Sequence, residues 1–204
     1  RADGDGARSL PVTNSKITAA QPIVVRRNTV AGYQLALNGN TLTCSEGNQY
    51  DVIFTAGEDD AAYVAPAVGV KLTGAEAENV FPAFAAKIGD LYYATFEAAY
   101  AAAEAGQTIE LLKPVVVAAG ETLTLDKAVT IKYTSNVPGE DMFTNRGTMV
   151  VDGATLVYTN TDTTASNVTV STISCEPGSV LNVTGGTIEN KTVYSTGSYA
   201  YAID

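Results

Sequence analysis

Residues 86–112 read AKIGDLYYATFEAAYAAAEAGQTIELL. The turn pair Gly89-Asp90 separates two short apolar runs, which predicts two short strands joined by a tight turn. A helical pattern follows over residues 94–105, and Thr108 begins another run of strand-forming residues. Strands and turns then continue to the last residue. This order predicts a helix that closes the open end of a stack of strands.

The predicted helix carries the signals that begin and end a helix, together with one apolar face. Thr95 is a suitable N-cap residue, and Glu97 places a negative charge near the positive end of the helix dipole. Gly106 suits the left-handed position at which many helices end. Side chains spaced at helical intervals form an apolar stripe, which we expect to pack as a cap over the first turn of strands: Phe96, Ala99, Tyr100 and Ala103.

The composition describes a chain with enough apolar residues for a core and with a strong negative charge. Of the 204 residues, 46% are hydrophobic and 17% are charged, which is typical of a folded chain and not of a disordered one. The net charge of −10 argues against nucleic acid and anionic membrane surfaces as partners. We expect no membrane span, because no apolar run is long enough to cross a bilayer.

The sequence contains no His and only two Cys, which limits the chemistry that it can perform. Without His, the commonest general base and the commonest transition-metal ligand are missing. Cys44 and Cys175 are too few for a zinc site. Two buried free thiols and a bridge between the halves of the chain both remain open. We therefore expect no cofactor, no metal and no catalytic residue here, and leave catalysis open for a full-length protein.

The residues before the helical stretch predict a leader and a small β domain. Residues 1–10 are polar, small and rich in Gly, as a flexible linker is. Residues 11–82 contain short alternating runs without a helix signal, and Asn38-Gly39-Asn40 is a hairpin signal. We interpret residues 11–82 as a small β-sandwich or barrel, with the domain boundary at Phe81-Pro82.

From residue 108 onward the strands recur as a loose repeat. Three units begin with Gly and contain an alternating strand, a polar turn and a second short strand: residues 120–131, 147–158 and 178–190. Their corresponding positions lie about 27 to 32 residues apart, a period that indicates a solenoid. Because each repeat holds strands and no helix, residues 83–204 are predicted to be the capped start of a parallel β-helix.

The same residues resemble a known family. Ile88-Gly89-Asp90, Tyr93-x-Thr95-Phe96 and Gly106-x-Thr108-Ile109 look like the entry unit of right-handed parallel β-helix proteins of the pectin-lyase-like type. Such units are found in large secreted and cell-surface proteins of host-associated bacteria. LNVTGGTI, at residues 181–188, resembles the rung repeat of those proteins. The resemblance covers about residues 86–204 and implies the fold, which lyases, hydrolases, adhesins and passive stalks share.

Two acidic features match enzymes of this fold only in part. Asp126 and Asp152 occupy matching turn positions, but two carboxylates are few ligands for a calcium ion. We therefore interpret them as ordinary turn residues. Asn160-Thr161-Asp162 matches the first short motif of the pectin-hydrolysing members. The adjacent Asp pair, the Gly-His-Gly and the Arg-Ile-Lys of those enzymes do not follow it. The sequence therefore favours a non-catalytic protein.

The end of the chain holds the candidate ligand and assembly residues. Tyr194, Tyr199 and Tyr201 offer rings on which sugars stack, although tyrosines in strands more often serve packing. The sequence stops at YAID within a strand pattern, and an uncovered strand leaves backbone groups unpaired. We expect this open solenoid end to contact a second copy or a partner chain through Tyr199, Ala200, Tyr201, Ala202 and Ile203.

These observations lead to one leading hypothesis and two alternatives. The leading hypothesis is a non-catalytic extracellular or cell-surface protein, either an adhesin or a structural stalk. The first alternative is a carbohydrate-active enzyme or carbohydrate-binding module whose key residues lie outside residues 1–204, with surface glycans as ligands. The second is a subunit of an extracellular assembly or phage fibre, in which a partner covers the open end.

Overall fold

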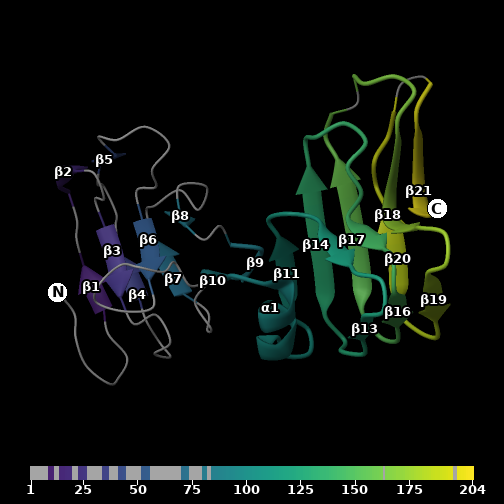
Figure 1. Cartoon of the computed structure of the whole chain (residues 1–204), viewed down its shortest axis with the longest axis horizontal. Helices are drawn as coiled ribbons and strands as arrows, with labels where there is room; N and C mark the ends of the chain where they lie inside the picture. Colours follow the sequence, from purple (N-terminus) through teal and green to yellow (C-terminus); the bar gives the residue numbers. More distant parts are fainter. Residues whose placement is uncertain are drawn as a thin grey trace. The chain divides into compact units, whose positions relative to one another are not determined.

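The computed structural model describes residues 9–11, 14–19, 23–26, 34–36, 41–44, 52–55, 70–73, 80–81, 84–162, 164–194 and 197–204. The chain divides into two compact units, Arg1–Ala101 and Ala102–Asp204. Figure 1 labels the helix and most of the strands. The domain boundaries expected from the sequence at residues 10 and 82 stay predictions.

The second unit is a parallel β-solenoid of about three turns, in which each turn adds strands to three ladders (Figure 1). The first ladder contains β11 (Thr108–Leu111), β14 (Thr130–Ser135), β17 (Thr155–Asn160) and β20 (Thr187–Asn190). The second contains β12 (Val115–Val117), β15 (Phe143–Asn145), β18 (Thr169–Cys175) and β21 (Tyr199–Ile203). The third contains β13 (Thr122–Leu125), β16 (Thr148–Val151) and β19 (Val180–Val183). This arrangement confirms the predicted parallel solenoid.

The strand register aligns apolar side chains from turn to turn. In the first ladder, Ile109, Ile131 and Leu156 are equivalent and fully buried. In the third ladder, Leu125 and Val151 are equivalent and also fully buried. Alternation along each strand places these side chains inside and their polar neighbours outside. Full burial of one such side chain contributes about 1.5–3 kcal/mol, so the columns form the core of the unit.

A glycine is required at two turns where the backbone packs closely. A Cβ at Gly147 would run into the carbonyl oxygens of Ala118 and Glu121 on the preceding turn. A Cβ at Gly186 would run into the Ala154 carbonyl, and Gly186 also has a φ of 90°. Only a residue without a side chain fits these two positions. Gly120 and Gly178, which begin two of the repeats, meet no neighbouring atom within 4 Å and instead have φ values of 82° and 89°.

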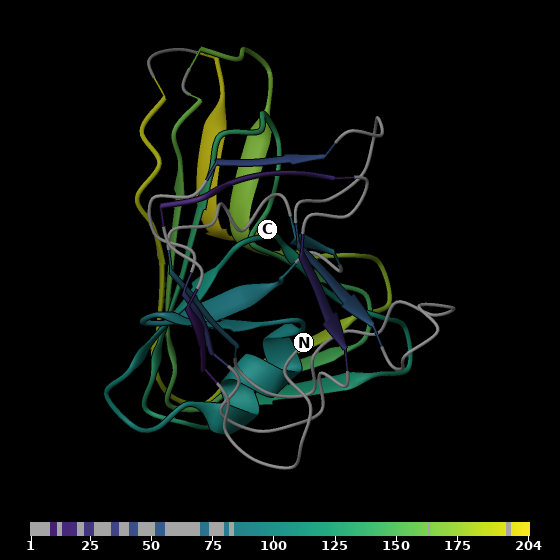
Figure 2. The same cartoon turned by 90° about the vertical axis from the view of Figure 1, so that its left-hand side faces the viewer.

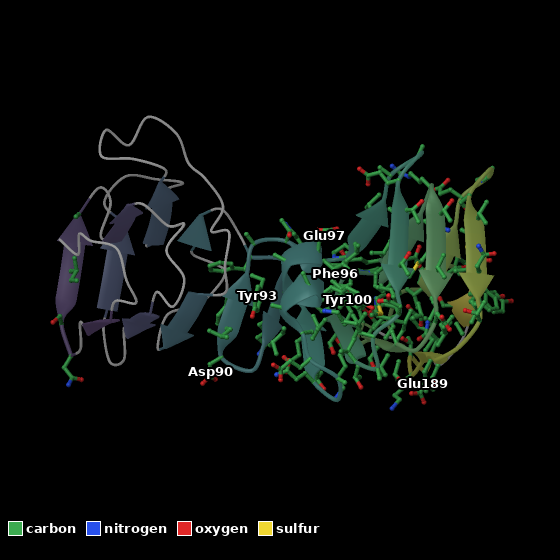
Figure 3. All side chains as sticks on the ribbon, turned by 90° about the horizontal axis from the view of Figure 1, so that it is seen from below. Asp90, Tyr93, Phe96, Glu97, Tyr100 and Glu189 are labelled. Carbon is green, nitrogen blue, oxygen red and sulfur yellow. The ribbon has the colours of Figure 1, made fainter. Side chains whose placement is uncertain are left out.

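Helix α1 (Phe96–Ala102) begins directly after the predicted N-cap Thr95, but it ends before residue 105, so Gly106 does not directly terminate it. The Ala98 N–H group donates to Thr95 Oγ1 at 3.1 Å, which is the expected N-cap bond. Gly106 adopts a φ of 84°. The predicted cap residues, two of which Figure 3 labels, are all buried, while their role as a cap stays a prediction: Phe96, Ala99, Tyr100 and Ala103.

The described strands before residue 82 also pair in parallel. One ladder contains β1 (Ser9–Pro11), β4 (Gln34–Ala36) and β7 (Val70–Thr73). A second contains β2 (Lys16–Ala19) and β5 (Thr41–Cys44), and a third contains β3 (Ile23–Arg26), β6 (Val52–Thr55) and β8 (Val80–Phe81). The antiparallel pairs of the first unit join β10 (Leu91–Tyr93) to β9 (Ala86–Ile88) and to β7.

These pairings correct the sandwich or barrel expected for residues 11–82. A small sandwich is built from antiparallel sheets, and the hairpin signal predicts that β4 and β5 pair with each other. Instead β4 pairs with β1 and β7, and β5 pairs with β2. Alternating residues suit parallel and antiparallel strands alike, so the pattern does not reveal the long-range partner. The leader residues 1–8 and Asn38-Gly39-Asn40 lie outside the described residues.

Candidate functional site

The three candidate tyrosines differ in environment. Tyr199 and Tyr201 lie on β21, are 61% and 41% exposed, and present parallel rings with centroids 6.1 Å apart and an interplanar angle of 4°. The Tyr194 hydroxyl is instead buried and has no hydrogen-bond partner among the described residues. Burial, with a smaller effect of the Asp162 charge, raises the pKa of Tyr194. Tyr199 and Tyr201 therefore form an exposed pair, whereas the hydroxyl of Tyr194 is buried apart from solvent.

The last turn of the solenoid exposes positions that are buried in earlier turns. Val183 is 48% exposed, whereas its equivalent Val151 is fully buried. Ile203 is 46% exposed, whereas its equivalent Ile173 is fully buried. In the part of the chain that the structure describes, β21 pairs only with β18, beside which it lies in Figure 2. The predicted assembly edge is thus the outermost strand of its ladder, and its contact with a partner stays a prediction.

A polar cluster that the sequence analysis missed lies where the first ladder turns toward the second. We call it the Glu140 corner; it comprises Tyr133, Ser135, Glu140, Tyr158 and Asn160. The Tyr133 hydroxyl donates to Glu140 Oε2 at 2.7 Å, and the Ser135 hydroxyl donates to the same oxygen. The Tyr158 hydroxyl donates to the Glu140 carbonyl. These bonds hold residues 136–142 against two successive turns.

Asn160 completes the Glu140 corner and explains the partial motif around it. Its side-chain amide donates to the Val137 carbonyl at 2.7 Å and to the Tyr158 hydroxyl at 3.1 Å, and Asn160 is 1% exposed. Its Oδ1 atom accepts the Asp162 N–H group at 2.9 Å. Asp162 also accepts bonds from Thr164, which lower its pKa. The Asn160-Thr161-Asp162 sequence therefore forms a hydrogen-bonded turn.

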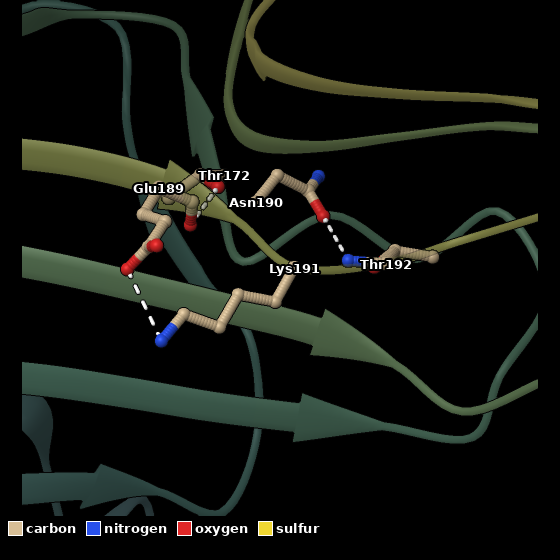
Figure 4. Close-up of polar contacts among 5 residues, drawn as sticks. All are labelled: Thr172, Glu189, Asn190, Lys191 and Thr192. Atoms are coloured by element: carbon tan, nitrogen blue, oxygen red, sulfur yellow. Dashed lines mark hydrogen bonds and ion pairs between the residues drawn. The ribbon is translucent and has the colours of Figure 1, made fainter.

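The end of β20 is tied to the second ladder by polar contacts (Figure 4). The Thr172 hydroxyl donates to the Glu189 carbonyl at 3.0 Å, and Asn190 Oδ1 accepts the Thr192 N–H group at 3.0 Å. The Asn190 amide also donates to the carbonyls of Val170 and Tyr201 at 3.1 and 2.8 Å. Because Asn190 bonds to both β18 and β21, it holds the last two strands of the second ladder to the first.

Electrostatics at the Glu140 corner reflect burial and neighbouring negative charge. Burial is the main cause that raises the pKa of Tyr158 to about 12, and the pKa of Tyr133 is raised further, by burial and by its bond to Glu140. Asp141 Oδ1 accepts the Ser171 N–H group at 2.6 Å, but burial and the charges of Asp204 and Glu140 raise the pKa of Asp141. These shifts favour the neutral forms of Tyr133, Tyr158 and Asp141.

The other residues considered as candidates from the sequence do not form a common site. Asp126 and Asp152 directly follow the paired Leu125 and Val151, so they sit on adjacent turns as expected. Among the described residues, no three Cys, Asp or Glu side chains lie where they could hold a metal ion. Cys175 is a half-buried free thiol. Within the described ranges, no helix has the length and apolar character needed to cross a membrane.

Comparisons of the chain with protein-family models, with curated proteins and with solved structures return no match. The likeness of residues 86–204 to β-helix proteins therefore rests on the sequence motifs and on the parallel solenoid of the second unit. The hand of the solenoid and its membership of the pectin-lyase-like type remain predictions.

Proposed function

We propose that this chain is a non-catalytic extracellular or cell-surface protein that acts as a structural stalk or adhesin. The main support is that buried polar side chains bond from one turn of the solenoid to another. Asn145, fully buried, donates to the Val180 carbonyl at 2.9 Å, and the Asn160 N–H group donates to Thr192 Oγ1 at 2.7 Å. Such bonds make a continuous rod out of successive turns.

The proposal includes the resemblance of the sequence to pectin-lyase-like β-helix proteins. A right-handed, pectin-lyase-like β-helix with a helical cap, on the surface of a host-associated bacterium, would combine the motifs of residues 86–112 with the observed solenoid. In a solenoid each turn contacts only its neighbours, so length and rigidity grow by repetition. A stalk needs these two properties and no active site.

Single-molecule force spectroscopy tests the proposed load-bearing role. The variant Asn145→Ala leaves the Gly147 N–H group and the Val180 carbonyl without their side-chain partner, which costs about 1–3 kcal/mol. We expect it to lower the unfolding force of the second unit. The matched control is Asn182→Ala, which changes an exposed Asn on β19 and should leave the force unchanged. Equal forces for both variants and the parent would contradict the proposal.

A second candidate function is carbohydrate binding, which the exposed Tyr199–Tyr201 pair favours. Two parallel rings of this kind offer an apolar surface for sugar rings, and binding at surface glycans would suit an adhesin. Screening the chain on a glycan array, with Tyr199→Ala/Tyr201→Ala as the variant, tests it. The control Val193→Ala alters a side chain that is 78% exposed elsewhere. Binding that survives the double variant would exclude the pair as the site.

A further inference from the structure

We propose that the outer face of β18 and β21 binds a sugar that carries a free amino group. The sugar ring stacks on Tyr199 and Tyr201, and its ammonium group faces the Asp141 carboxylate. This site rests on the carbohydrate-binding function proposed above and specifies its residues and its ligand class. A sugar without an amino group would stack on the same rings but would lack the ionic contact.

Asp141 points away from the interior of the solenoid. Its neighbour Glu140 points inward, because the largely buried Tyr133 donates its hydroxyl to the Glu140 carboxylate. The Met142 N–H group donates to the Ser171 carbonyl at 3.0 Å, so the pairing of the second ladder begins before β15. Neighbouring residues of a ladder face opposite sides, which places Asp141 on the outer side. There Asp141 Oδ1 accepts the Ser171 N–H group at 2.6 Å.

The two tyrosines share this outer face. The Thr172 side chain points inward, where its hydroxyl donates to a carbonyl of β20 at 3.0 Å, so its neighbour Ser171 points outward. Ser171 and Tyr201 are equivalent in the register and therefore face the same side. Tyr199 is equivalent to Thr169, which is exposed although β21 follows it. The face is thus open because it points outward, and not because it belongs to the last turn.

A buried hydroxyl without a partner lies between Asp141 and Tyr201 on this face. Ser171 is fully buried, and its Oγ atom has no hydrogen-bond partner among the described residues. A buried polar group without a partner is destabilising, so it marks a position at which a bound molecule can supply the missing bond. A sugar hydroxyl suits this position, because it donates and accepts hydrogen bonds as the Ser hydroxyl does.

The local charge favours an amine over an acid. Burial raises the pKa of Asp141, and the negative charges of Asp204 and Glu140 raise it further. The carboxylate accepts bonds from Ser171 and Ser174, and an ionised carboxylate accepts about four in total, so it has room for another donor. An ammonium group supplies both the donor and the opposite charge, whereas the carboxylate of an acidic sugar would be repelled.

Calorimetric titration with three tetrasaccharides tests the site: those of glucosamine, N-acetylglucosamine and galacturonic acid. We expect the glucosamine tetramer to bind about tenfold more tightly than the N-acetylglucosamine tetramer, as one charged hydrogen bond gives, and the galacturonic acid tetramer to bind most weakly. Asp141→Asn should remove this preference. The matched control Asp152→Asn changes the net charge equally, at an exposed turn position, and should retain the preference.

The hydroxyl of Ser171 supplies a second arm. Ser171→Ala should weaken binding of both glucosamine sugars without lowering the melting temperature, because the hydroxyl that it removes has no partner in the described fold. Unchanged binding by this variant would contradict the site. Thermal unfolding of every variant checks that the fold is intact.

Three other results would overturn the inference: equal affinity of the parent for the amino and N-acetyl sugars, a preference that survives Asp141→Asn, and a preference that disappears in Asp152→Asn. Sugars that bind through Tyr199 and Tyr201 without such a preference would refute the amino-sugar site alone. Failure of every sugar to bind would also refute the carbohydrate-binding function. The force measurement on single chains tests the stalk function separately.

Discussion

The rings of Tyr133 and Tyr158 stack on adjacent turns of the solenoid, with centroids 5.8 Å apart and an interplanar angle of 14°. Both residues occupy the same register position of β14 and β17, and both donate their hydroxyls to Glu140. One loop residue therefore receives bonds from two turns. The Glu140 corner therefore acts as a joint, meaning a set of bonds that links two successive turns. Substitution of each Tyr by Phe removes one of these hydroxyls at a time.

The variant Tyr158→Phe tests the joint. It leaves the Glu140 carbonyl without this donor and removes an acceptor of the Asn160 amide, while the stacked ring is kept. We expect a loss of about 1–3 kcal/mol in the free energy of unfolding, measured by urea denaturation. Tyr199→Phe, at a position that is 61% exposed, should change stability little. Equal stability of the two variants would mean that the corner is not a joint.

Replacing Gly by Ala at two positions distinguishes the stability cost of a steric clash from the cost of a left-handed backbone conformation. Gly147→Ala drives a Cβ into two carbonyl oxygens, and we expect a loss of at least about 3 kcal/mol, the upper end of typical overpacking costs. Gly120→Ala meets no atom within 4 Å but must keep a φ of 82°, which costs about 1–2 kcal/mol. Urea denaturation of both variants gives the comparison. A Gly120→Ala loss as large as that of Gly147→Ala would contradict the predicted clash.

Asp141 and Asp162 should affect the pH dependence of stability with opposite sign. Burial raises the pKa of Asp141, so its contribution is present below the ordinary value of 3.8 and is lost as pH rises through the raised pKa. Bonds from Thr164 lower the pKa of Asp162, so its contribution is present above 3.8 and is lost as pH falls through the lowered pKa. At neutral pH we therefore expect Asp141→Asn to be at least as stable as the parent and Asp162→Asn to be less stable. Thermal unfolding from acid to neutral pH is the measurement, and the reverse order would refute the assignment.

The buried face of α1 is tested by Ala99→Asp. Ala99 is fully buried, so the variant places an unpaired charge in an apolar environment and should cost several kcal/mol in stability. Ala101→Asp, at an exposed position on the same helix, is the matched control. Unchanged melting of Ala99→Asp would show that this face does not act as a packed cap.

The proposal of a non-catalytic protein predicts no cleavage of polygalacturonate, with or without calcium. The chain has no His, and Asp162 is engaged in bonds to its own loop. Release of unsaturated or reducing ends is the assay. Turnover that scales with purified protein and disappears in Asp162→Ala would reverse the functional reading.

Local signals were the ones that sequence reasoning read correctly. Thr95 caps α1, and Gly106 adopts a left-handed conformation beyond its end, because both effects depend on a few neighbouring residues. The period of the repeat likewise predicted a parallel solenoid. The partner of a strand is a long-range property, so the alternation around Leu35 suited an antiparallel hairpin as well as the parallel pairing that the structure shows. The residues of the candidate site are likewise brought together by long-range pairing, which the local pattern does not reveal.

The Glu140 corner was not predicted because its residues come from separate parts of the sequence and match no known motif. Tyr133 and Tyr158 occupy equivalent positions, which is a signal that the register makes visible only after the turns are aligned. The difference between Tyr194 and the Tyr199–Tyr201 pair depends on burial of one hydroxyl. No spacing rule distinguishes these environments before the fold is known.

The connections between the ladders differ in how much change they tolerate. The first ladder joins the second through residues 112–114, 136–142, 161–168 and 191–198, whereas the second joins the third through residues as few as 146–147. The parallel register persists across these unequal connections. One inserted residue within a strand would turn every following side chain to the opposite face. Variation in length is therefore concentrated at the corner between the first and second ladders, and a peptide grafted there should preserve stability only where it leaves the bonds of Glu140 to Tyr133, Ser135 and Tyr158 in place.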